Sequence, residues 1–390
     1  MVNYYFILDV ENFISMGSHT RYGYPNMYFD PRPKTKKEDL YNREKELKQF
    51  FKAISYSSLI VVTGLRRTGK TSFVNVALVE SDCPFAILDL RGLPFNPSYA
   101  DIVRRLEAAF RQINRKWLSD FSEALKHLKG VSFLGNELSF EWGKAGVDLA
   151  ELFSEIDKWA EKKNRKFLIA YDEIQVIRGD KWMLHFLAHV VDSYHNIVVV
   201  VTGSEVGVLF DFLGLDQPNS PLYGRHFVQV QMTNFSASTA KDFLVSGFRQ
   251  IKLEPSAELL EYAVKRLDGV PGWLTLFGVR CRDRNDCSRE LVDEVASEAG
   301  KLAREEVLKI VALSRRYGAT LNFLARIGPA TWSQIKSVIE TKEARSITNH
   351  AVTTVLKNLC NMGIVMRIDN RYVISDVLLS EGIREDPLPE

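Results

Sequence analysis

Short, uninterrupted apolar runs recur between residues 59 and 235, and their spacing constrains the fold more than any other feature of the sequence. They lie at residues 59–63, 85–88, 167–171 and 197–201, with a weaker fifth at 227–230. Strands of a parallel sheet have this composition, because helices cover both faces of such a sheet. Stretches with helical periodicity separate the runs. The alternation predicts an α/β domain, a parallel sheet flanked by helices, over residues 41–235.

Two segments near this alternation have other patterns. Residues 26–40 combine prolines with a basic cluster of Lys34, Lys36 and Lys37, which is typical of an extended lead-in segment. Residues 131–142 contain two short apolar runs around a Gly-Asn pair, so we expect a β-hairpin inserted into the α/β domain as an edge or a lid.

The chain beyond residue 235 changes to helical patterning. Residues 236–302 predict an all-α lid, which Gly269-Val270-Pro271-Gly272 punctuates between two helices. A helix is expected at 303–316. Residues 317–380 then predict three helices, one with Thr331 as its N-cap, and a hairpin, which is the order of a winged helix. The predicted domains are an N-terminal extension with its lead-in segment (1–40), the α/β domain (41–235), the helical lid (236–302) and a C-terminal winged-helix domain (303–390).

A glycine-rich loop follows the first apolar run. Its sequence, Gly64-Leu65-Arg66-Arg67-Thr68-Gly69-Lys70-Thr71, matches the P-loop pattern G-x-x-x-x-G-K-[ST], and residues 72–79 predict a helix directly after it. In that setting backbone N–H groups and the helix N-terminus converge on phosphate oxygens. We expect Lys70 to contact the β- and γ-phosphates of ATP, Thr71 to bind Mg²⁺, and Ser72 to line the same site. A glycine turn that carries Lys-Thr by chance is the alternative.

Two carboxylates, Asp172 and Glu173, end the third apolar run. The strand would aim Asp172 at the metal, where it can hold a magnesium-bound water. Glu173 can orient and deprotonate the water that attacks the γ-phosphate. This pair favours hydrolysis over transfer to another acceptor, although a solvated loop start would show the same residues.

The fourth apolar run ends in Thr202-Gly203-Ser204-Glu205. A polar side chain on the strand beside the acidic strand can contact both the γ-phosphate and the attacking water. Ser204 and Thr202 are therefore candidates, and a plain Ser/Thr helix cap is the alternative.

Together these residues resemble the archaeal ATPases, a STAND-type branch of the AAA+-like P-loop NTPases. The resemblance runs from about Phe29 to the C-terminus, and Asn42 stands where the family usually has Asp. Besides the P-loop, it rests on residues 29–34, 41–47, 171–175, 201–207, 220–225 and 269–274.

The resemblance implies a nucleotide-binding core, a helical lid and a C-terminal winged helix. It places Arg43 near the bound nucleotide and makes Pro271, on the lid, a sensor of nucleotide state. Arg225 resembles the family's finger-like arginine, which would face the γ-phosphate, in the same chain or across subunits, and neutralise charge in the transition state. Arg66 and Arg67 match the family form of the loop, although either could be solvated.

We expect a magnesium-dependent ATPase that turns over slowly and acts as a nucleotide-driven switch. One alternative is an ATP-regulated DNA-binding protein that uses the winged helix, where His350, Lys357, Arg367 and Arg371 could contact phosphates. The winged helix could instead bind a protein partner or pack on the lid, and the chain could form a homo-oligomer. A signalling switch with negligible hydrolysis is a further alternative.

Composition excludes few of these possible functions. The formal net charge of +2 does not by itself indicate a nucleic-acid or membrane partner. The four cysteines match no zinc pattern, so we expect free thiols in a reducing compartment. No apolar run approaches the ~18–20 residues of a membrane span, and the N-terminal segment lacks the marks of a signal peptide. A cytoplasmic protein is expected.

Overall fold

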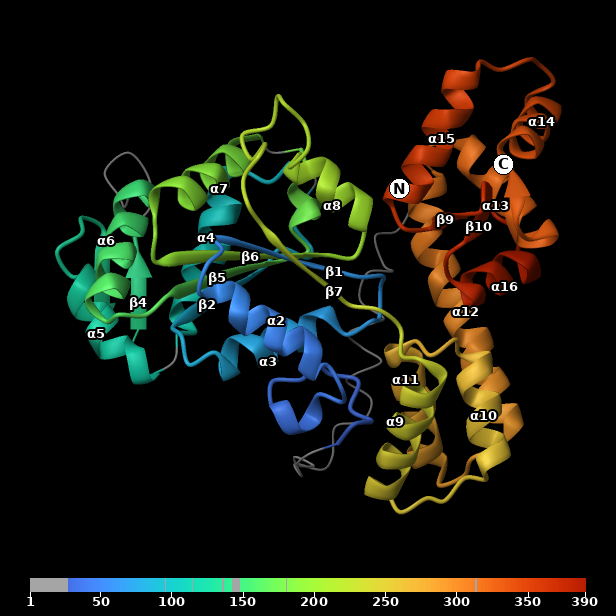
Figure 1. Ribbon diagram of the computed structural model, residues 1–390, viewed down its shortest axis with the longest axis horizontal. Helices are drawn as coiled ribbons and strands as arrows, with labels where there is room; N and C mark the ends of the chain where they lie inside the picture. Colours follow the sequence, from blue (N-terminus) through green and yellow to red (C-terminus); the bar gives the residue numbers. More distant parts are fainter. Residues whose placement is uncertain are drawn as a thin grey trace, which may run out of the picture.

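The computed structural model of the chain describes residues 27–94, 96–113, 115–134, 137–141, 148–179, 181–312 and 314–390. Most of the N-terminal extension that we predict, residues 1–26, and the hairpin turn at 135–136 lie outside the described residues. In the described part, an α/β core, a bundle of helices and a C-terminal domain follow one another along the chain (Figure 1).

The core is built on a five-stranded sheet with the order β2-β5-β6-β1-β7, in which all neighbouring strands run parallel. Each strand lies where the sequence predicts one. The strands are β1 (Leu59–Thr63), β2 (Phe85–Asp89), β5 (Phe167–Asp172), β6 (Ile197–Gly203) and β7 (Val228–Gln231). The predicted fold, a parallel sheet flanked by helices, is confirmed.

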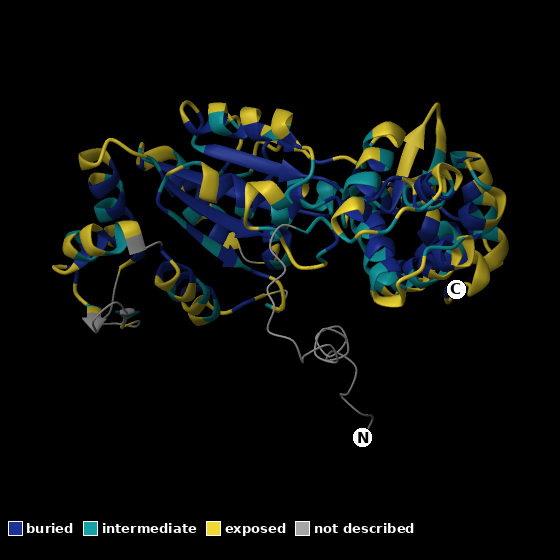
Figure 2. Ribbon diagram, turned by 90° about the horizontal axis from the view of Figure 1, so that it is seen from below, coloured by how far each residue is buried: buried dark blue, intermediate teal, exposed yellow. Residues whose placement is uncertain are grey.

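Alternate residues of each strand enter two separate hydrophobic cores, one on each face of the sheet. Ile60 and Val62 pack against α2 (Glu44–Ile54) and α3 (Lys70–Glu80). Leu59 and Val61 belong to the core of the opposite face. Helices α4 (Tyr99–Arg111), α5 (Arg115–Leu125), α6 (Leu149–Lys162), α7 (Lys181–Ser193) and α8 (Val206–Leu213) cover that face. The three central strands β1, β5 and β6 are consequently buried on both sides, as Figure 2 shows in dark blue, whereas the edge strand β7 exposes Gln229 and Gln231.

The predicted hairpin is present as β3 (Val131–Leu134) and β4 (Glu137–Phe140), which pair antiparallel. These strands form a two-stranded sheet of their own and do not extend the edge of the central sheet. Strand β4 lies against α4, on the side of the core away from the C-terminal domain (Figure 1).

A helical bundle follows the core and consists of α9 (Ala237–Gln250), α10 (Ala257–Arg266), α11 (Pro271–Arg284) and the first half of α12 (Arg289–Val311). The lead-in segment, expected to be extended, supplies a core residue to this bundle. Phe29 is 1% exposed, and a Cβ placed on Gly247 or Gly278 would lie 2.3 Å from its ring. Glycine at these two positions lets the bundle close around Phe29. A 3-10 helix at Lys37–Asp39 follows in the lead-in segment.

The C-terminal domain is a winged helix, as predicted. It contains α13 (Arg315–Ile327), β8 (Ala330–Thr331), α14 (Trp332–Glu343), α15 (Asn349–Asn361), β9 (Val365–Ile368) and β10 (Arg371–Ile374). Thr331 caps α14, and its side chain accepts a hydrogen bond from the Gln334 amide. A last helix, α16 (Val377–Glu385), was not predicted, although Asp376 caps it and an apolar run follows.

Helix α12 differs from the sequence prediction. We expected one helix at 303–316, but α12 runs without a break from Arg289 to Val311, and α13 begins at Arg315. Its first half enters the core of the helical bundle, and its second half, from Ala303, enters the core of the winged helix. The boundary that we place at 302/303 falls inside this helix, so the division into domains stays a prediction. Within the described ranges, no helix combines the length and apolarity needed to cross a membrane.

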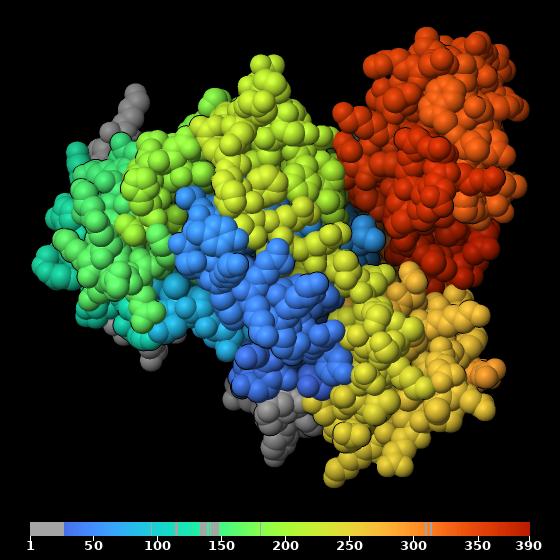
Figure 3. Space-filling view, in the orientation of Figure 1, coloured from blue at the N-terminus to red at the C-terminus, as the bar shows by residue number. Residues whose placement is uncertain are grey.

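The winged helix also packs directly on the α/β core, as the space-filling view shows (Figure 3). Helix α15 contacts α8, and a Cβ on Gly207 would lie 2.2 Å from the Cα of Asn361. The side-chain amide of Asn361 donates a hydrogen bond to the carboxylate of Asp211. Backbone therefore approaches backbone at this contact, and only glycine fits at position 207.

Candidate functional site

The loop between β1 and α3 curls around the ammonium group of Lys70. Lys70 Nζ donates hydrogen bonds to the carbonyl oxygens of Gly64 and Leu65, each 2.9 Å away. The residue is 6% exposed, and burial lowers the pKa of Lys70 to about 8, against the opposing effect of nearby carboxylates. Gly69 precedes α3 with a φ of 91° and has no side chain to cap it. The first amides of α3 are thus available to an anion, as the sequence predicts.

The first residue of the loop, Gly64, must be glycine because its surroundings are closely packed. A Cβ on Gly64 would lie 2.4 Å from the carbonyl oxygen of Met232 and 2.9 Å from Thr68 Oγ1. Thr68 Oγ1 in turn donates to the Leu65 carbonyl at 2.8 Å. The loop is thereby fixed between the ends of β1 and β7, before any ligand contact is considered.

Asp172 lies at the carboxyl end of β5, beside the loop. Its Oδ2 accepts a hydrogen bond from Thr71 Oγ1 at 3.2 Å, and its Oδ1 accepts one from Thr202 Oγ1 at 2.6 Å. Burial, assisted by the charge of Glu173, raises the pKa of Asp172. A hydroxyl and a carboxylate are hard oxygen ligands of the kind that Mg²⁺ takes when phosphates and waters complete its shell. The two predicted metal-site residues fit that group.

Glu173 is oriented by the neighbouring strand β6. Its Oε2 accepts hydrogen bonds from the Ser204 amide at 3.1 Å, from Ser204 Oγ at 2.9 Å, and from the side-chain amide of Gln175. Its own backbone N–H donates to Thr202 Oγ1 at 2.9 Å. Three donors thus converge on a single oxygen of Glu173 and hold the side chain in one orientation. The predicted cluster of Lys70, Thr71, Asp172, Glu173 and Ser204 is brought together.

Both loop arginines make ion pairs with α12, although Arg66 stays exposed and Arg67 is half-buried. Glu306 accepts from Arg67 Nη2 through Oε1, and its Oε2 pairs with Arg66 Nη1, each at 2.8 Å. Arg66 Nη2 also pairs with Glu205 at 3.4 Å. The guanidinium of Arg67 lies 4.1 Å from the ring centroid of Trp273 on α11. Arg66 and Arg67 therefore connect the loop to the helical bundle and to the start of the winged helix.

Two clefts flank the loop and share Arg67, Gly69 and Ser72. The first is lined by Lys70, Thr71, Arg91, Glu173, Gln175, Ser204 and Glu205. The second lies between the lead-in segment, the loop and the helical bundle. Its lining includes Tyr28, Leu40, Tyr41, Arg43, Thr68, Met232, Phe235, Pro271 and Leu276. The first cleft is polar and charged, whereas the second combines aromatic and aliphatic residues with charged residues of the lead-in segment, among them Asp30, Arg32 and Lys34. The first suits the phosphates of a nucleotide, and the apolar part of the second suits its base.

Arg43 and Pro271 both line the second cleft, and hydrogen bonds connect Arg43 and the residue after Pro271 to the P-loop. Arg43 is 4% exposed, and its Nη2 donates to the carbonyl oxygens of Thr233 at 2.7 Å and Thr68 at 3.3 Å. It therefore supports the backbone of the loop. Pro271 is the first residue of α11, and the next amide, of Gly272, donates to the Arg67 carbonyl at 3.0 Å. The start of α11 is hydrogen-bonded to the loop itself.

Arg225 does not join the cluster. It makes a two-pronged ion pair with Asp192 of α7, at 2.8 and 2.6 Å, and donates to the Tyr223 carbonyl. Its neighbour His226 contacts Tyr56, which precedes β1, whereas the loop follows β1. Arg225 thus lies at the amino edge of the parallel sheet, on the order of 20 Å from the loop. The expectation that Arg225 faces a γ-phosphate of its own chain is corrected.

Several residues of the site were missed or given no role by sequence reasoning. Gln175 lies within the acidic motif, and its donor contact to Glu173 could have been considered because it is only two residues away. Arg91 follows β2 at the same sheet edge, and its Nη2 lies 3.9 Å from Asp172. Glu306 has no local signal, because a glutamate on an amphipathic helix usually faces solvent.

A sequence profile for an ATPase domain found predominantly in archaea matches residues 40–277. The chain belongs to this archaeal ATPase family. Residues 301–374 of the chain match a second profile, for the C-terminal winged helix-turn-helix domain of MCM proteins. No curated protein matches the sequence.

Solved structures agree with this assignment. The Walker-type ATPase of Pyrococcus abyssi is 30% identical, with a TM-score of 0.78 over 92% of this chain and 100% of that one. The ORC2 protein of Aeropyrum pernix, solved in ADPNP-ADP complexes, is 12% identical, with a TM-score of 0.60 over 92% of this chain and 95% of that one. The second likeness shows the fold alone.

Proposed function

We propose that this member of the ATPase family binds ATP with Mg²⁺, hydrolyses it slowly, and uses the nucleotide as a switch of domain arrangement. One observation supports this most strongly: Glu173, held on one oxygen by three donors, lies beside Thr71 and the buried Asp172 at the mouth of the loop that contains Lys70. A loop that only bound phosphate would not need a carboxylate oriented in this way.

The loop residues would bind and orient the triphosphate. Backbone amides at the start of α3 and the ammonium of Lys70 supply positive charge where the β- and γ-phosphates would lie. Thr71 and Asp172 would hold Mg²⁺, which when bound neutralises phosphate charge. Tyr41, Phe235 and Leu276 would enclose the base in the second cleft. Arg43 would keep the loop in shape through its bonds to Thr68 and Thr233.

Glu173 would act on the attacking water. Its Oε2 is saturated by Ser204 and Gln175, so its Oε1 is the oxygen that can accept a proton. Ser204 would fix the direction of that oxygen; because its hydroxyl carries one proton, it would donate either to Glu173 or to the γ-phosphate, and not to both. Substitution of either partner should therefore slow hydrolysis more than it weakens binding.

The switch would operate through α11 and α12. The start of α11, at Pro271, is hydrogen-bonded to the loop through Gly272, and α12 contacts the loop through Glu306. A change in the loop on binding or hydrolysis would move both helices, and α12 carries the winged helix. The proposed units are the α/β domain at 41–235, the helical lid at 236–302 and the winged-helix domain at 303–390.

Steady-state phosphate release with Mg²⁺ tests the proposal on wild type, Lys70→Ala and Glu173→Gln. We expect Lys70→Ala to lose ATP binding, and Glu173→Gln to bind ATP while releasing phosphate at least about 100-fold more slowly. Exposed residues give matched controls, Lys52→Ala and Glu161→Gln, which should behave as wild type. If all variants hydrolyse ATP at the wild-type rate, the proposal fails. A wild type that binds ATP without turnover would instead be a signalling switch that only binds.

We also propose a role for the winged helix in contacting DNA. His350 and Lys357 on α15, and Arg367 and Arg371 on the hairpin, are exposed. This part of the chain matches the winged helix-turn-helix profile, which favours DNA over a protein partner for this face. Electrophoretic mobility shifts at about 50 and 200 mM salt test it, because real phosphate contacts weaken steeply with salt. Binding that ignores salt, or no binding, would contradict the role.

Arg225 would serve the γ-phosphate of a neighbouring copy in a homo-oligomer, since it lies far from the loop of its own chain. We also place the protein in the cytoplasm, a reducing compartment, because Cys83, Cys281, Cys287 and Cys360 are free.

A further inference from the structure

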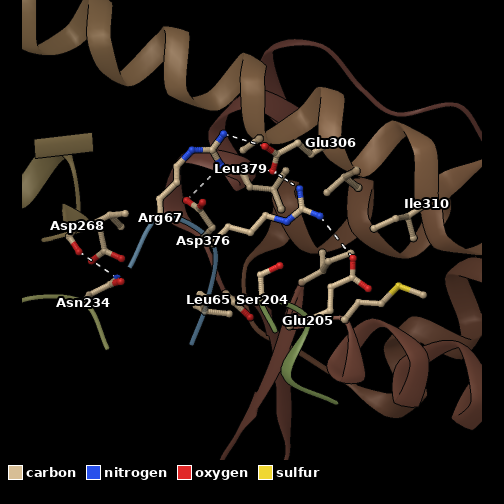
Figure 4. A pocket seen from close by; sticks show the side chains of 18 residues that line it. Leu65, Arg67, Ser204, Glu205, Asn234, Asp268, Glu306, Ile310, Asp376 and Leu379 are labelled. Atoms are coloured by element: carbon tan, nitrogen blue, oxygen red, sulfur yellow. Dashed lines mark hydrogen bonds and ion pairs between the residues drawn. The ribbon is translucent and has the colours of Figure 1, made fainter. Parts of the chain in front are cut away.

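Glu306 is the only acidic residue that the structure shows bound to both arginines of the loop, among the described residues. Each of its oxygens takes one guanidinium at 2.8 Å, and Oε2 accepts a second, longer bond from Arg67 at 3.4 Å. Burial would raise the pKa of Glu306, but the two arginines lower it on balance. Figure 4 shows Glu306 and Arg67 facing each other across the join between α12 and the loop.

This carboxylate lies in the cleft that the triphosphate would enter. Glu306 lines that cleft together with Arg66, Lys70, Thr71, Glu173 and Ser204. Arg66 also lies close to Lys70 and Glu173: its charge helps to lower the pKa of Lys70, and the charge of Glu173 helps to raise the pKa of Arg66. A guanidinium at this end of the loop is suited to the outermost phosphate of ATP, and a carboxylate is the protein's own substitute for that anion.

The position of Glu306 couples the cleft to the winged helix. Just before it, Ala303 already belongs to the winged-helix core, and Val307 follows in the same core. Two more contacts hold the winged helix on the core near the cleft: α15 against α8 at Gly207, and Gly363, where a Cβ would lie 3.0 Å from Leu65. The winged helix is therefore docked on the loop and on the α/β core at the same time.

We propose that the carboxylate of Glu306 is an internal anion that competes with the γ-phosphate of ATP for Arg66 and Arg67, so that ATP releases α12 and the docked winged helix. The inference rests on the proposed function, since it needs a triphosphate in the cleft. A nucleotide that lacks the outermost phosphate competes poorly, so ADP leaves the winged helix docked. Glu306 thereby sets the preference of the site between ATP and ADP.

Thermodynamic linkage fixes the direction in which ATP affinity should change when Glu306 is substituted. While Glu306 occupies the arginines, ATP must displace it, so part of the binding free energy of ATP is used for undocking. Removing the charge of Glu306 returns that free energy to ATP affinity. It also undocks the winged helix without any nucleotide, because binding couplings are reciprocal.

Nucleotide affinities test the competition directly. Dissociation constants of ADP and of a non-hydrolysable ATP analogue are measured with Mg²⁺ on wild type, Glu306→Gln and Glu305→Gln. Glu305 is the exposed neighbour on the same helix and controls for the charge change. We expect Glu306→Gln to bind the ATP analogue about tenfold more tightly and ADP within about twofold of wild type. Glu305→Gln should change neither constant.

Small-angle X-ray scattering tests the release of the winged helix. We expect the radius of gyration of wild type to increase with the ATP analogue and to stay unchanged with ADP. Glu306→Gln should be expanded without nucleotide. Gly207→Ala should also expand the protein, because the added methyl group would meet the backbone of Asn361 at a contact outside the cleft. Asn361→Ala provides a second undocking variant, and either variant should also tighten the ATP analogue.

Each outcome decides the inference. Equal affinities in wild type and Glu306→Gln, or equal tightening of ADP and the ATP analogue, would overturn it while the ATPase assignment stands. The inference would also be overturned if Gly207→Ala and Asn361→Ala expand the protein without any gain in ATP affinity. A wild type that binds neither nucleotide would instead defeat the proposed function itself. Should Glu306→Gln fail to fold, Gly207→Ala and Asn361→Ala give the same affinity test.

Discussion

The hydroxyl of Thr71 donates a 3.2 Å hydrogen bond to the carboxylate of Asp172, 101 positions further along the chain. The contact exists because β1 and β5 run parallel in one sheet, with β6 between them, so their carboxyl ends meet at one edge. Thr202, at the end of β6, binds the other oxygen of the same carboxylate at 2.6 Å. The ends of β5 and β6, together with the first turn of α3, thus place polar residues around one buried charge.

The first prediction concerns the stability cost of that charge. Because burial raises the pKa of Asp172, the folded protein binds this proton more tightly than the unfolded chain does. Stability therefore falls as pH rises from the ordinary value of 3.8 through the raised one, and the ionised group remains unfavourable above it. We expect Asp172→Asn to stabilise the nucleotide-free protein at pH 7 by about 1 kcal/mol while magnesium-dependent ATP binding is lost.

The control lies in the same register on the neighbouring strand, where Asp89 pairs with Asp172. Burial alone would raise the pKa of Asp89, but hydrogen bonds from Arg91 lower it overall. Thermal melts should therefore show a small destabilisation for Asp89→Asn and a gain for Asp172→Asn. A loss of stability in Asp172→Asn would count against a strained, functional carboxylate.

The second prediction is a pH dependence of ATP affinity. Lys70 has a pKa of about 8 in the nucleotide-free protein, below its ordinary 10.5, because it is buried. Between these values the unfolded chain holds a proton that the folded protein lacks, so stability without nucleotide rises with pH. Binding has the opposite trend, since the triphosphate requires a charged ammonium.

Isothermal titration calorimetry in buffers of different ionisation enthalpy measures this effect. We expect the dissociation constant of the ATP analogue to be nearly flat up to about pH 7.5 and to rise by up to about tenfold per pH unit above 8, with proton uptake on binding. An affinity that stays flat to pH 9.5 without proton uptake would show that the charge of Lys70 does not carry binding.

The third prediction separates orientation of Glu173 from nucleotide binding. Ser204→Ala removes the 2.9 Å bond from Ser204 Oγ but keeps the bond from the backbone amide. We expect kcat to fall about tenfold, with KM within about twofold of wild type. Ser337→Ala, an exposed serine on α14, is the matched control. A change in KM alone would mean that Ser204 binds nucleotide and does not position the base.

The fourth prediction addresses Arg225 at the amino edge of the sheet. In dilute solution Arg225→Ala should bind ATP like wild type, and losing the exposed pair with Asp192 should cost about 0–1 kcal/mol of stability. If Arg225 serves a neighbouring copy, wild-type turnover per chain rises with protein concentration, and Arg225→Ala abolishes that rise. Arg249→Ala, another exposed arginine, controls for the charge. Weakened ATP binding by dilute Arg225→Ala would contradict its placement.

Much of this site could be predicted because its signals are local. A strand that ends at Gly64, a loop closed by Lys70 and a helix after it are adjacent in sequence, so periodicity and motif fix them together. Asp172 and Ser204 could be placed by a single further argument, that parallel strands bring their carboxyl ends to one edge. The winged helix followed from element order alone, although α16 was missed at its end.

The rest depended on contacts between distant segments, which periodicity does not encode. Phe29 looks like part of an extended lead-in, yet it fills the core of the helical bundle because Gly247 and Gly278 leave room for its ring. Glu306 looks like a solvated helix residue, yet α12 carries it to the loop arginines. The choice between a role for Arg225 in its own chain and one across subunits stayed open, because a motif resemblance states no position relative to the sheet edges.

A crystal structure of the protein with Mg²⁺ and a non-hydrolysable ATP analogue would decide whether this loop is the nucleotide site. We expect the β- and γ-phosphates within hydrogen-bonding distance of the amides of residues 64–71 and of Lys70 Nζ. We also expect Mg²⁺ beside Thr71 and Asp172, and a water within reach of Glu173. A triphosphate bound elsewhere, with the loop empty, would overturn the proposed function.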